Sequence, residues 1–184
     1  MRNILLDEIK KEISTWDKSD IYVVSLYVYD ECDNPCEPTV TLGYNTVSNY
    51  ENETQYASDE EEAKWNYAFW LQNDELVFGR GKTKDIVKQW IEDMGFTYLS
   101  YDEMFNSDNS PDYEYYEGIT KAFIKVLVDI VKELHSSGFI KEQFGKAIPV
   151  IIHELEYYDE IAKQNIEANS YELVEEFVDF CGAY

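Results

Sequence analysis

The segment Gly79–Thr83 (GRGKT) has residue types that could hold a phosphate, because Gly-Lys-Thr between a strand and a helix is the end of a P-loop. A P-loop also needs a glycine five residues before Gly81, and the chain has Leu76 at that position. Without the long glycine loop, too few backbone N–H groups converge on a phosphate. We therefore interpret the segment as a turn that leads into a helix capped by Thr83.

Cys32 and Cys36 lie in a polar segment, and their spacing suggests metal or redox chemistry. A structural zinc site uses four Cys or His ligands, and the chain has only Cys181 and two distant histidines to complete it. Carboxylates beside a thiol also disfavour the reactive thiolate. We therefore expect a hairpin loop with free thiols, and we expect no metal site and no cofactor.

His135 and His153 are the two histidines, and neither has a candidate nucleophile near it in the sequence. A catalytic triad is assembled across a fold, so residue spacing does not exclude one. Carboxylate pairs do not identify a site either, because 38 acidic residues place some pair at a glycosidase-like separation by chance. We expect structural roles for both histidines and name no catalytic residue.

The hydrophobic pattern predicts the elements that would position any such residues. Ile21–Tyr29 is almost entirely apolar or aromatic, which favours a central strand covered on both faces, and Thr39–Thr46 alternates like an antiparallel neighbour. The expected fold is α+β, a single domain of residues 1–184 in which the central hairpin Ile21–Thr46 belongs to an antiparallel sheet packed by several helices. Helices are predicted over residues 3–15, 58–70, 83–94, 119–135, 161–169 and 169–181, short strands at 75–79 and 149–152, and loops at 45–57 and 107–116.

The composition restricts the class of protein and its partners. The formal net charge is −23, from 38 acidic and 15 basic residues. Nucleic-acid affinity depends on Lys and Arg, so we expect no direct binding to DNA, RNA or a membrane surface. The same field attracts a basic protein and speeds its association. High acidity also keeps a protein soluble without any partner, and the charge alone does not separate these two interpretations.

The sequence also suggests a compartment. The first helix mixes charged and apolar residues, and no run of about 18 apolar residues follows that could span a bilayer. Three cysteines are too few and odd in number for a disulfide framework, which fits a reducing compartment. We therefore expect a cytoplasmic protein.

Acidic residues and tyrosines lie together in the predicted loops and helix starts. A tyrosine ring supplies rigid contact area and a carboxylate supplies charge complementarity, so this composition suits a binding surface. The helix dipole alone also explains acids at the start of a helix. The residues that we predict to contact a partner are Glu51, Glu53, Asp59, Glu60, Glu61, Glu62, Asp112, Tyr113, Glu114, Tyr115, Tyr116 and Glu117.

Four segments follow one another in an order that resembles a known family: Trp16, IYVVSLYVYD, PTVTLGYNT and EEAKWNYAFWLQN. The family is an uncharacterised group of small bacterial cytoplasmic proteins, a domain of unknown function associated with polymorphic-toxin immunity loci alongside SUKH-type immunity proteins. The resemblance is clearest over Trp16–Gln72 and extends loosely to Cys181. It implies an antiparallel sheet packed by helices, and it transfers no catalytic residue because the shared motifs are structural.

The immunity association implies that the protein binds and occludes the effector domain of a secreted toxin, often a basic nuclease. We therefore predict a non-enzymatic acidic binding protein, an immunity protein that neutralises a bacterial toxin domain. The alternative is a small intracellular enzyme, a hydrolase or a nucleotide-handling protein, whose site forms only in three dimensions.

Overall fold

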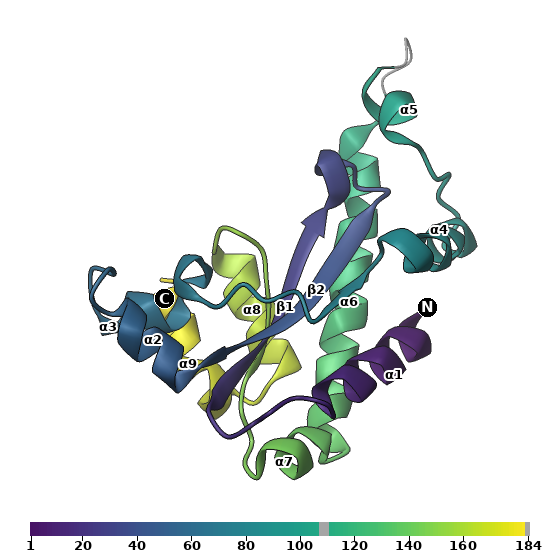
Figure 1. The fold of residues 1–184 in the computed structure, drawn as a ribbon. Coiled ribbons are helices and arrows are strands. Elements are labelled where there is room, and N and C mark those ends of the chain that lie inside the picture. The colour runs from purple at the N-terminus through teal and green to yellow at the C-terminus, as the bar shows by residue number, and fades with distance from the viewer. Residues whose placement is uncertain (107–110, 183–184) are drawn as a thin grey trace.

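The computed structural model describes residues 1–106 and 111–182 of the chain (Figure 1). Its strands are β1 (Ile21–Asp30), β2 (Pro38–Thr46), β3 (Leu76–Phe78) and β4 (Val150–His153). Its helices are α1 (Arg2–Ile13), α2 (Val47–Glu53), α3 (Glu60–Trp65), α4 (Lys84–Asp93), α5 (Tyr101–Phe105), α6 (Tyr113–Ser136), α7 (Phe139–Phe144), α8 (Asp159–Ala168) and α9 (Tyr171–Phe180). Single 3-10 turns are η1 (Glu31–Asp33), η2 (Tyr67–Phe69) and η3 (Gly81–Thr83).

The strands form one sheet in the order β3-β2-β1-β4. β1 and β2 are antiparallel, with Leu26 opposite Leu42, and β2 and β3 are antiparallel as well. These pairings confirm the expected α+β class and the central hairpin. The sheet is mixed rather than wholly antiparallel, because β4 runs parallel to β1, with Leu26 opposite Ile152. The long crossover through α6 returns the chain in the direction of β1, as a parallel pair requires.

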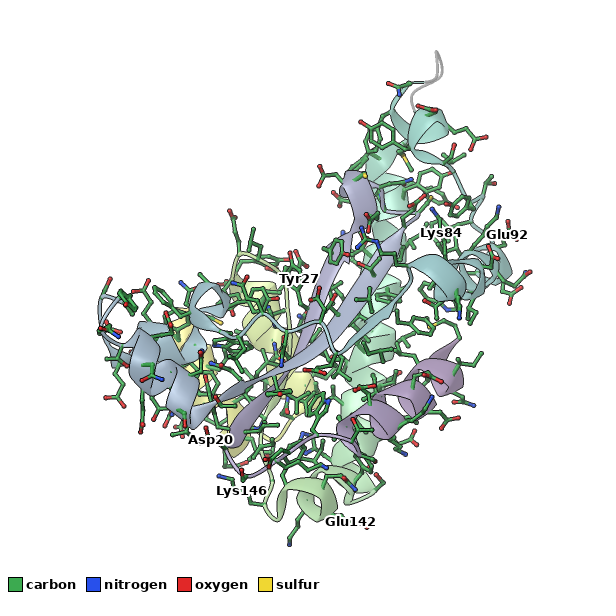
Figure 2. All side chains as sticks on the ribbon, in the orientation of Figure 1. Asp20, Tyr27, Lys84, Glu92, Glu142 and Lys146 are labelled. Carbon is green, nitrogen blue, oxygen red and sulfur yellow. The ribbon has the colours of Figure 1, made fainter. Side chains whose placement is uncertain are left out.

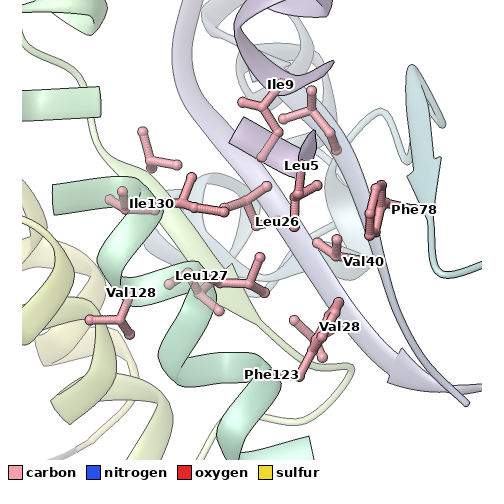
Figure 3. Packing of buried hydrophobic residues seen from close by; sticks show 14 of the residues in the cluster. Leu5, Ile9, Leu26, Val28, Val40, Phe78, Phe123, Leu127, Val128 and Ile130 are labelled. Carbon is pink, nitrogen blue, oxygen red and sulfur yellow. The ribbon is translucent and has the colours of Figure 1, made fainter. Parts of the chain in front are cut away.

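β1 is covered on both faces, as its continuous apolar pattern predicts. Leu26 and Val28 point into a core with α1, α4 and α6, whereas Val23, on the opposite face, packs with residues of α3, α8 and α9. Figure 3 shows side chains of α1 and α6 converging on the sheet from one side, including Ile9 and Leu127. α8 and α9 lie on the other side in Figure 1.

In the part of the chain that the structure describes, no strand pairs with the outer edge of β4, and two asparagines at the end of α8 take the place of one. Asn165 accepts a hydrogen bond from Ile152 N at 2.8 Å and donates to Ile152 O at 2.7 Å. Asn169 does the same for Val150 N and O, both at 3.0 Å. A side-chain amide carries both a donor and an acceptor, so each asparagine satisfies both polar groups of one strand residue. The edge is therefore closed to further strand pairing.

The structure corrects several predicted boundaries. Residues 45–57, predicted to be a loop, contain α2, whose first turn is capped because Thr46 accepts a hydrogen bond from Asn49 N at 3.1 Å. Asp59, rather than Ser58, caps α3 by accepting from Glu62 N, and that helix ends at Trp65 instead of near Trp70. Hydrogen bonds of single side chains to the backbone determine where these helices begin. The spacing of hydrophobic residues does not predict such bonds.

The start of the last helix and the start of α6 also differ from the predicted residues. Asn169 was predicted to start the final helix, but Ser170 is its N-cap, and the Asn169 amide is used by β4. Within the predicted loop 107–116, α6 already begins at Tyr113, and residues 107–110 lie outside the described part of the chain.

We predict that replacing Asn165 with Leu lowers the free energy of unfolding by about 3 kcal/mol, because the buried Ile152 N–H loses its acceptor. Urea denaturation measures this change. Lys163→Ala is the control, since it alters an exposed residue of the same helix and should change the free energy by less than about 0.5 kcal/mol. Equal effects of the two substitutions would contradict a structural role for the amide.

Candidate functional site

A cleft of about 400 Å3 lies where β1 and β4 end. Because these strands are parallel, their carboxyl ends meet at one edge of the sheet, a position where ligands bind in many α/β proteins. Asp30 ends β1, Glu154 follows β4, and Glu117 of α6 and Glu160 of α8 line the remaining walls. The fold therefore gathers carboxylates from segments far apart in the sequence into one concave site.

Asp30 lies in this cleft with its hydrogen bonds incomplete. Thr120 donates to Asp30 Oδ2 at 2.8 Å, whereas Oδ1 has almost no solvent-accessible surface and no hydrogen-bond partner among the described residues. Burial is the main cause that raises the pKa of Asp30 to about 6, the Thr120 hydrogen bond opposes it, and nearby carboxylates including Glu154 add to the rise. A buried acceptor without a donor destabilises the folded state. The carboxylate of Asp30 therefore lowers the stability of the folded protein.

Tyrosines surround the carboxylates of the cleft. Tyr158 Oη donates to Glu154 at 2.7 Å, and Tyr113 Oη donates to the Asp33 carbonyl at 3.2 Å. Burial, followed by the negative charge of Asp30 and Glu117, raises the pKa of Tyr113. Lys121, whose ammonium lies 3.5 Å from Glu117, is the basic side chain in the lining. Four carboxylates therefore face one ammonium group.

A row of stacked tyrosines adjoins the cleft. Tyr27 stacks on Tyr67 at a centroid distance of 5.0 Å and on Tyr29 at 5.4 Å. Tyr27 belongs to β1 and is labelled in Figure 2. Its ring also lies against His153, the residue before Glu154, at a centroid distance of 5.6 Å. The row therefore lies next to the end of β4.

The sheet also brings together a serine and a histidine that sequence spacing did not connect. Ser25 Oγ lies 2.8 Å from His153 Nε2, although the two residues are 128 positions apart. His153 Nδ1 donates to the Glu154 carbonyl at 3.0 Å, so Nε2 is the acceptor for the serine hydroxyl. Burial lowers the pKa of His153 to about 4, which keeps the imidazole neutral. This is the arrangement in which a histidine activates a serine nucleophile.

Solvent cannot reach this pair. Ser25 is 3% exposed and His153 0%, and the rings of Tyr27, Tyr67 and Trp70 pack against the imidazole. A nucleophile needs contact with its substrate, and Ser25 is buried on the face of the sheet that packs against α3, α8 and α9. We therefore interpret the hydrogen bond as the means by which two buried polar side chains satisfy each other.

The residues predicted to contact a partner fall into two separate groups. Residues 51–62 lie on α2 and α3, and residues 112–117 lie at the start of α6, at another end of the molecule (Figure 1). Tyr113 and Glu117 line the cleft. Tyr113 and Tyr115 are 42% and 52% exposed, whereas Tyr116 is only 9% exposed because it packs near Phe96 in the core.

Sequence reasoning missed four residues of the cleft lining: Asp30, Glu154, Tyr158 and Glu160. The first two are charged residues at the ends of apolar strands, a weak signal that becomes specific only when the strands are known to be parallel. Helix geometry also explains part of the α2–α3 group, since Asp59 is an N-cap and Glu60, Glu61 and Glu62 occupy the first turn of α3.

The other candidate residues from the sequence are Gly79–Thr83, the cysteines and His135, and the contacts that they make in the structure stabilise the fold. Thr83 accepts a hydrogen bond from Gly79 N at 2.9 Å within the turn, and Gly79 has φ 100°, which favours glycine. Cys32 is exposed, and burial raises the pKa of Cys36. Among the described residues, no group of three or more His, Cys, Asp or Glu side chains is suitable for holding a metal ion. His135 Nε2 lies 2.9 Å from the side-chain oxygen of Asn169, which links α6 to the β4 edge.

No family model, curated protein or solved structure matches the chain. Within residues 1–106 and 111–182, no helix is long and apolar enough to cross a membrane.

Replacing Asp30 with Asn is expected to stabilise the protein by an amount that depends on pH. The folded pKa of about 6 exceeds the ordinary value of 3.8, so the folded chain binds this proton more tightly than the unfolded chain. Asp30 therefore contributes stability below pH 3.8 and loses it as the pH rises through 6. The advantage of Asp30→Asn should grow between about pH 4 and 6, to at most about 3 kcal/mol.

Urea unfolding of both proteins at several pH values across this range measures the difference. His153 has the opposite pH dependence, because its folded pKa is lowered, but it is present in both proteins and cancels in the comparison. Asp7→Asn changes the charge equally at an exposed position of α1 and is expected to show no such widening. A constant gap across the range would exclude a buried, titrating Asp30.

The enclosed Ser25–His153 pair predicts that a fluorophosphonate reagent leaves Ser25 unlabelled in the folded protein, because the reagent cannot reach the hydroxyl. Ser25→Ala should lower the free energy of unfolding by about 1 to 2 kcal/mol, since His153 Nε2 loses its donor. Mass spectrometry detects the label. Modification of the wild type that disappears in the Ser25→Ala variant would instead support the hydrolase alternative.

Proposed function

We propose that this protein is a non-enzymatic immunity protein, which acts in the bacterial cytoplasm and neutralises a basic toxin domain by covering its functional surface. The observation that carries the proposal is the concentration of exposed tyrosines and carboxylates around the cleft. We define the acidic rim as four residues of the cleft lining, Tyr113, Glu117, Tyr158 and Glu160, together with Glu114 and Tyr115, exposed neighbours in the first turn of α6 that do not line the cleft.

The acidic rim has the composition of a protein-binding surface rather than of a merely soluble one. Solubility requires charge but no exposed rings, yet Tyr113, Tyr115 and Tyr158 are 42%, 52% and 42% exposed. Tyrosine is enriched at interfaces because its ring contributes apolar area while its hydroxyl remains hydrogen-bonded. The rim thus combines contact area with the charge that a basic partner requires.

The net charge of −23 supports the same proposal. A strongly negative protein draws a positive partner through long-range attraction, which raises the association rate at low ionic strength. A nuclease presents basic residues to the phosphates of its substrate. An acidic inhibitor that covers those residues imitates the nucleic acid and blocks the active surface.

The rim, rather than the acids of α2 and α3, is the part of the predicted surface that we place at the interface. The acids of α3 stabilise their own helix start, and Lys64 of that helix forms an ion pair with Glu176. The rim instead opens into a cleft that contains Asp30. A concave site with tyrosine walls has a shape that a partner side chain can fill.

Immobilised wild-type protein should capture a basic protein, or a co-expressed toxin domain from the same operon, at 50 mM salt and release it near 500 mM. Replacing Glu114, Glu117 and Glu160 with Lys should weaken capture at least tenfold. Replacing Glu51, Glu60 and Glu61 with Lys makes the same change in net charge at the other group and is expected to weaken capture by less than about threefold.

Pull-down at both salt concentrations, followed by mass spectrometry, identifies the partner and ranks the two variants. Circular dichroism shows whether each variant is folded. Absence of any basic protein at low salt would refute the proposed function, and equal weakening by the two variants would place the interface outside the acidic rim.

A further inference from the structure

The cleft contains a carboxylate whose capacity to accept hydrogen bonds is not used by the protein. A carboxylate offers about four lone-pair positions, and Thr120 occupies one of them on Asp30 Oδ2. Oδ1 is closed to solvent and has no partner among the described residues. Oδ2, which lies beside Thr120 of the cleft lining and keeps one free lone pair, is the oxygen that a donor in the cleft reaches.

The walls of the cleft suit a flat, positively charged group. Tyr113 and Tyr158 contribute aromatic side chains to the lining, and Ile124 contributes an apolar one. Asp30, Glu117, Glu154 and Glu160 contribute four carboxylates, and Lys121, which pairs with Glu117 at 3.5 Å, offsets one of them. Rings attract a cation over their faces, and carboxylates accept its hydrogen bonds. These two kinds of contact occur together here in a volume of about 400 Å3, within the range of small-ligand sites.

We propose that this cleft is a guanidinium site, which takes one arginine side chain from the protein partner and pairs it with Asp30. The inference rests on the proposed function, because it requires the partner to be a basic protein. Arginine fits better than lysine, since its planar group stacks on tyrosine, donates in several directions and is more weakly hydrated than an ammonium group. A metal ion fits less well, because no cluster of three or more suitable ligands forms among the described residues.

Arginine binding explains why a carboxylate that destabilises the free protein occurs at position 30. In the free protein its carboxylate is buried and incompletely hydrogen-bonded, which destabilises the fold. A bound guanidinium adds a donor to Oδ2 and supplies the opposite charge in a partly desolvated site, where such a pair contributes more than it does on the surface. Destabilisation of the free protein and affinity for the partner thus have one origin.

The test uses the intact protein and three blocked tripeptides: acetyl-Gly-Arg-Gly-amide, the corresponding lysine peptide, and the citrulline peptide. Citrulline has the shape of arginine without its charge. Titration followed by 15N–1H NMR should give a dissociation constant on the order of millimolar for the arginine peptide. The amide shifts should centre on Asp30, Thr120 and Glu154. We expect at least threefold weaker binding of the lysine peptide and at least tenfold weaker binding of the citrulline peptide.

Variants of the protein separate the cleft from the general acidity of the surface. Asp30→Asn should weaken binding of the arginine peptide at least tenfold, and it is expected to remain folded because it removes a buried charge. Asp7→Asn makes the same charge change on α1 and should bind like the wild type. Tyr158→Leu, which removes one aromatic wall, should weaken binding about threefold or more. Unchanged binding by Asp30→Asn, or shifts centred elsewhere, overturns the guanidinium site.

Failure of this inference can be distinguished from failure of the proposed function. If Asp30→Asn captures the basic partner as well as the wild type does, the cleft assignment is wrong and the immunity function stands. If no basic protein is captured while the arginine peptide binds at Asp30, the immunity function is refuted and the guanidinium site is supported.

Discussion

The structure depends on the way β4 is held at the edge of the sheet. Asn165 and Asn169 give this strand the hydrogen bonds that a further strand would provide, and they also fix α8 against it. His135 connects the same amide of Asn169 to α6. With β4 in place beside β1, the carboxyl ends of two parallel strands meet, and Asp30 and Glu154 become neighbours in one cleft. The candidate site is thus a consequence of how the outer edge of β4 obtains its hydrogen bonds.

Two buried polar centres near the β1–β4 pairing illustrate opposite outcomes. Ser25 and His153 satisfy each other in an enclosed position, which gives them the geometry of a catalytic pair but no access to a substrate. Asp30 is only partly satisfied, and it lies where a cleft opens to solvent. Local departures from complete hydrogen bonding tend to coincide with functional sites, because the fold tolerates them only where another requirement is met. The cleft is therefore the stronger candidate.

The acidic residues have different physical roles, and the role depends on where each residue lies in the structure. Acids in the first turn of α3 stabilise that helix. Glu167 accepts hydrogen bonds from Lys125 and Lys132, which hold its pKa at about 2 and connect α6 to α8. The carboxylates around the cleft instead face tyrosines and one lysine. The lining of the cleft has four carboxylates and one lysine, so its own residues do not balance its negative charge.

The sequence by itself determined the α+β class, the central hairpin and most helices, because burial imposes a period on apolar residues that can be recognised locally. It also determined the charge and the presence of tyrosines beside acids at the start of α6. Tertiary structure alone decided that β4 is parallel to β1, that Asn169 binds a strand instead of capping a helix, and that Asp30, Glu154 and Tyr158 share a cleft. The β1–β4 pairing joins residues more than 100 positions apart, and Asn169 lies 19 positions from Val150; no local pattern encodes which of the possible partners completes a hydrogen bond or a cavity wall.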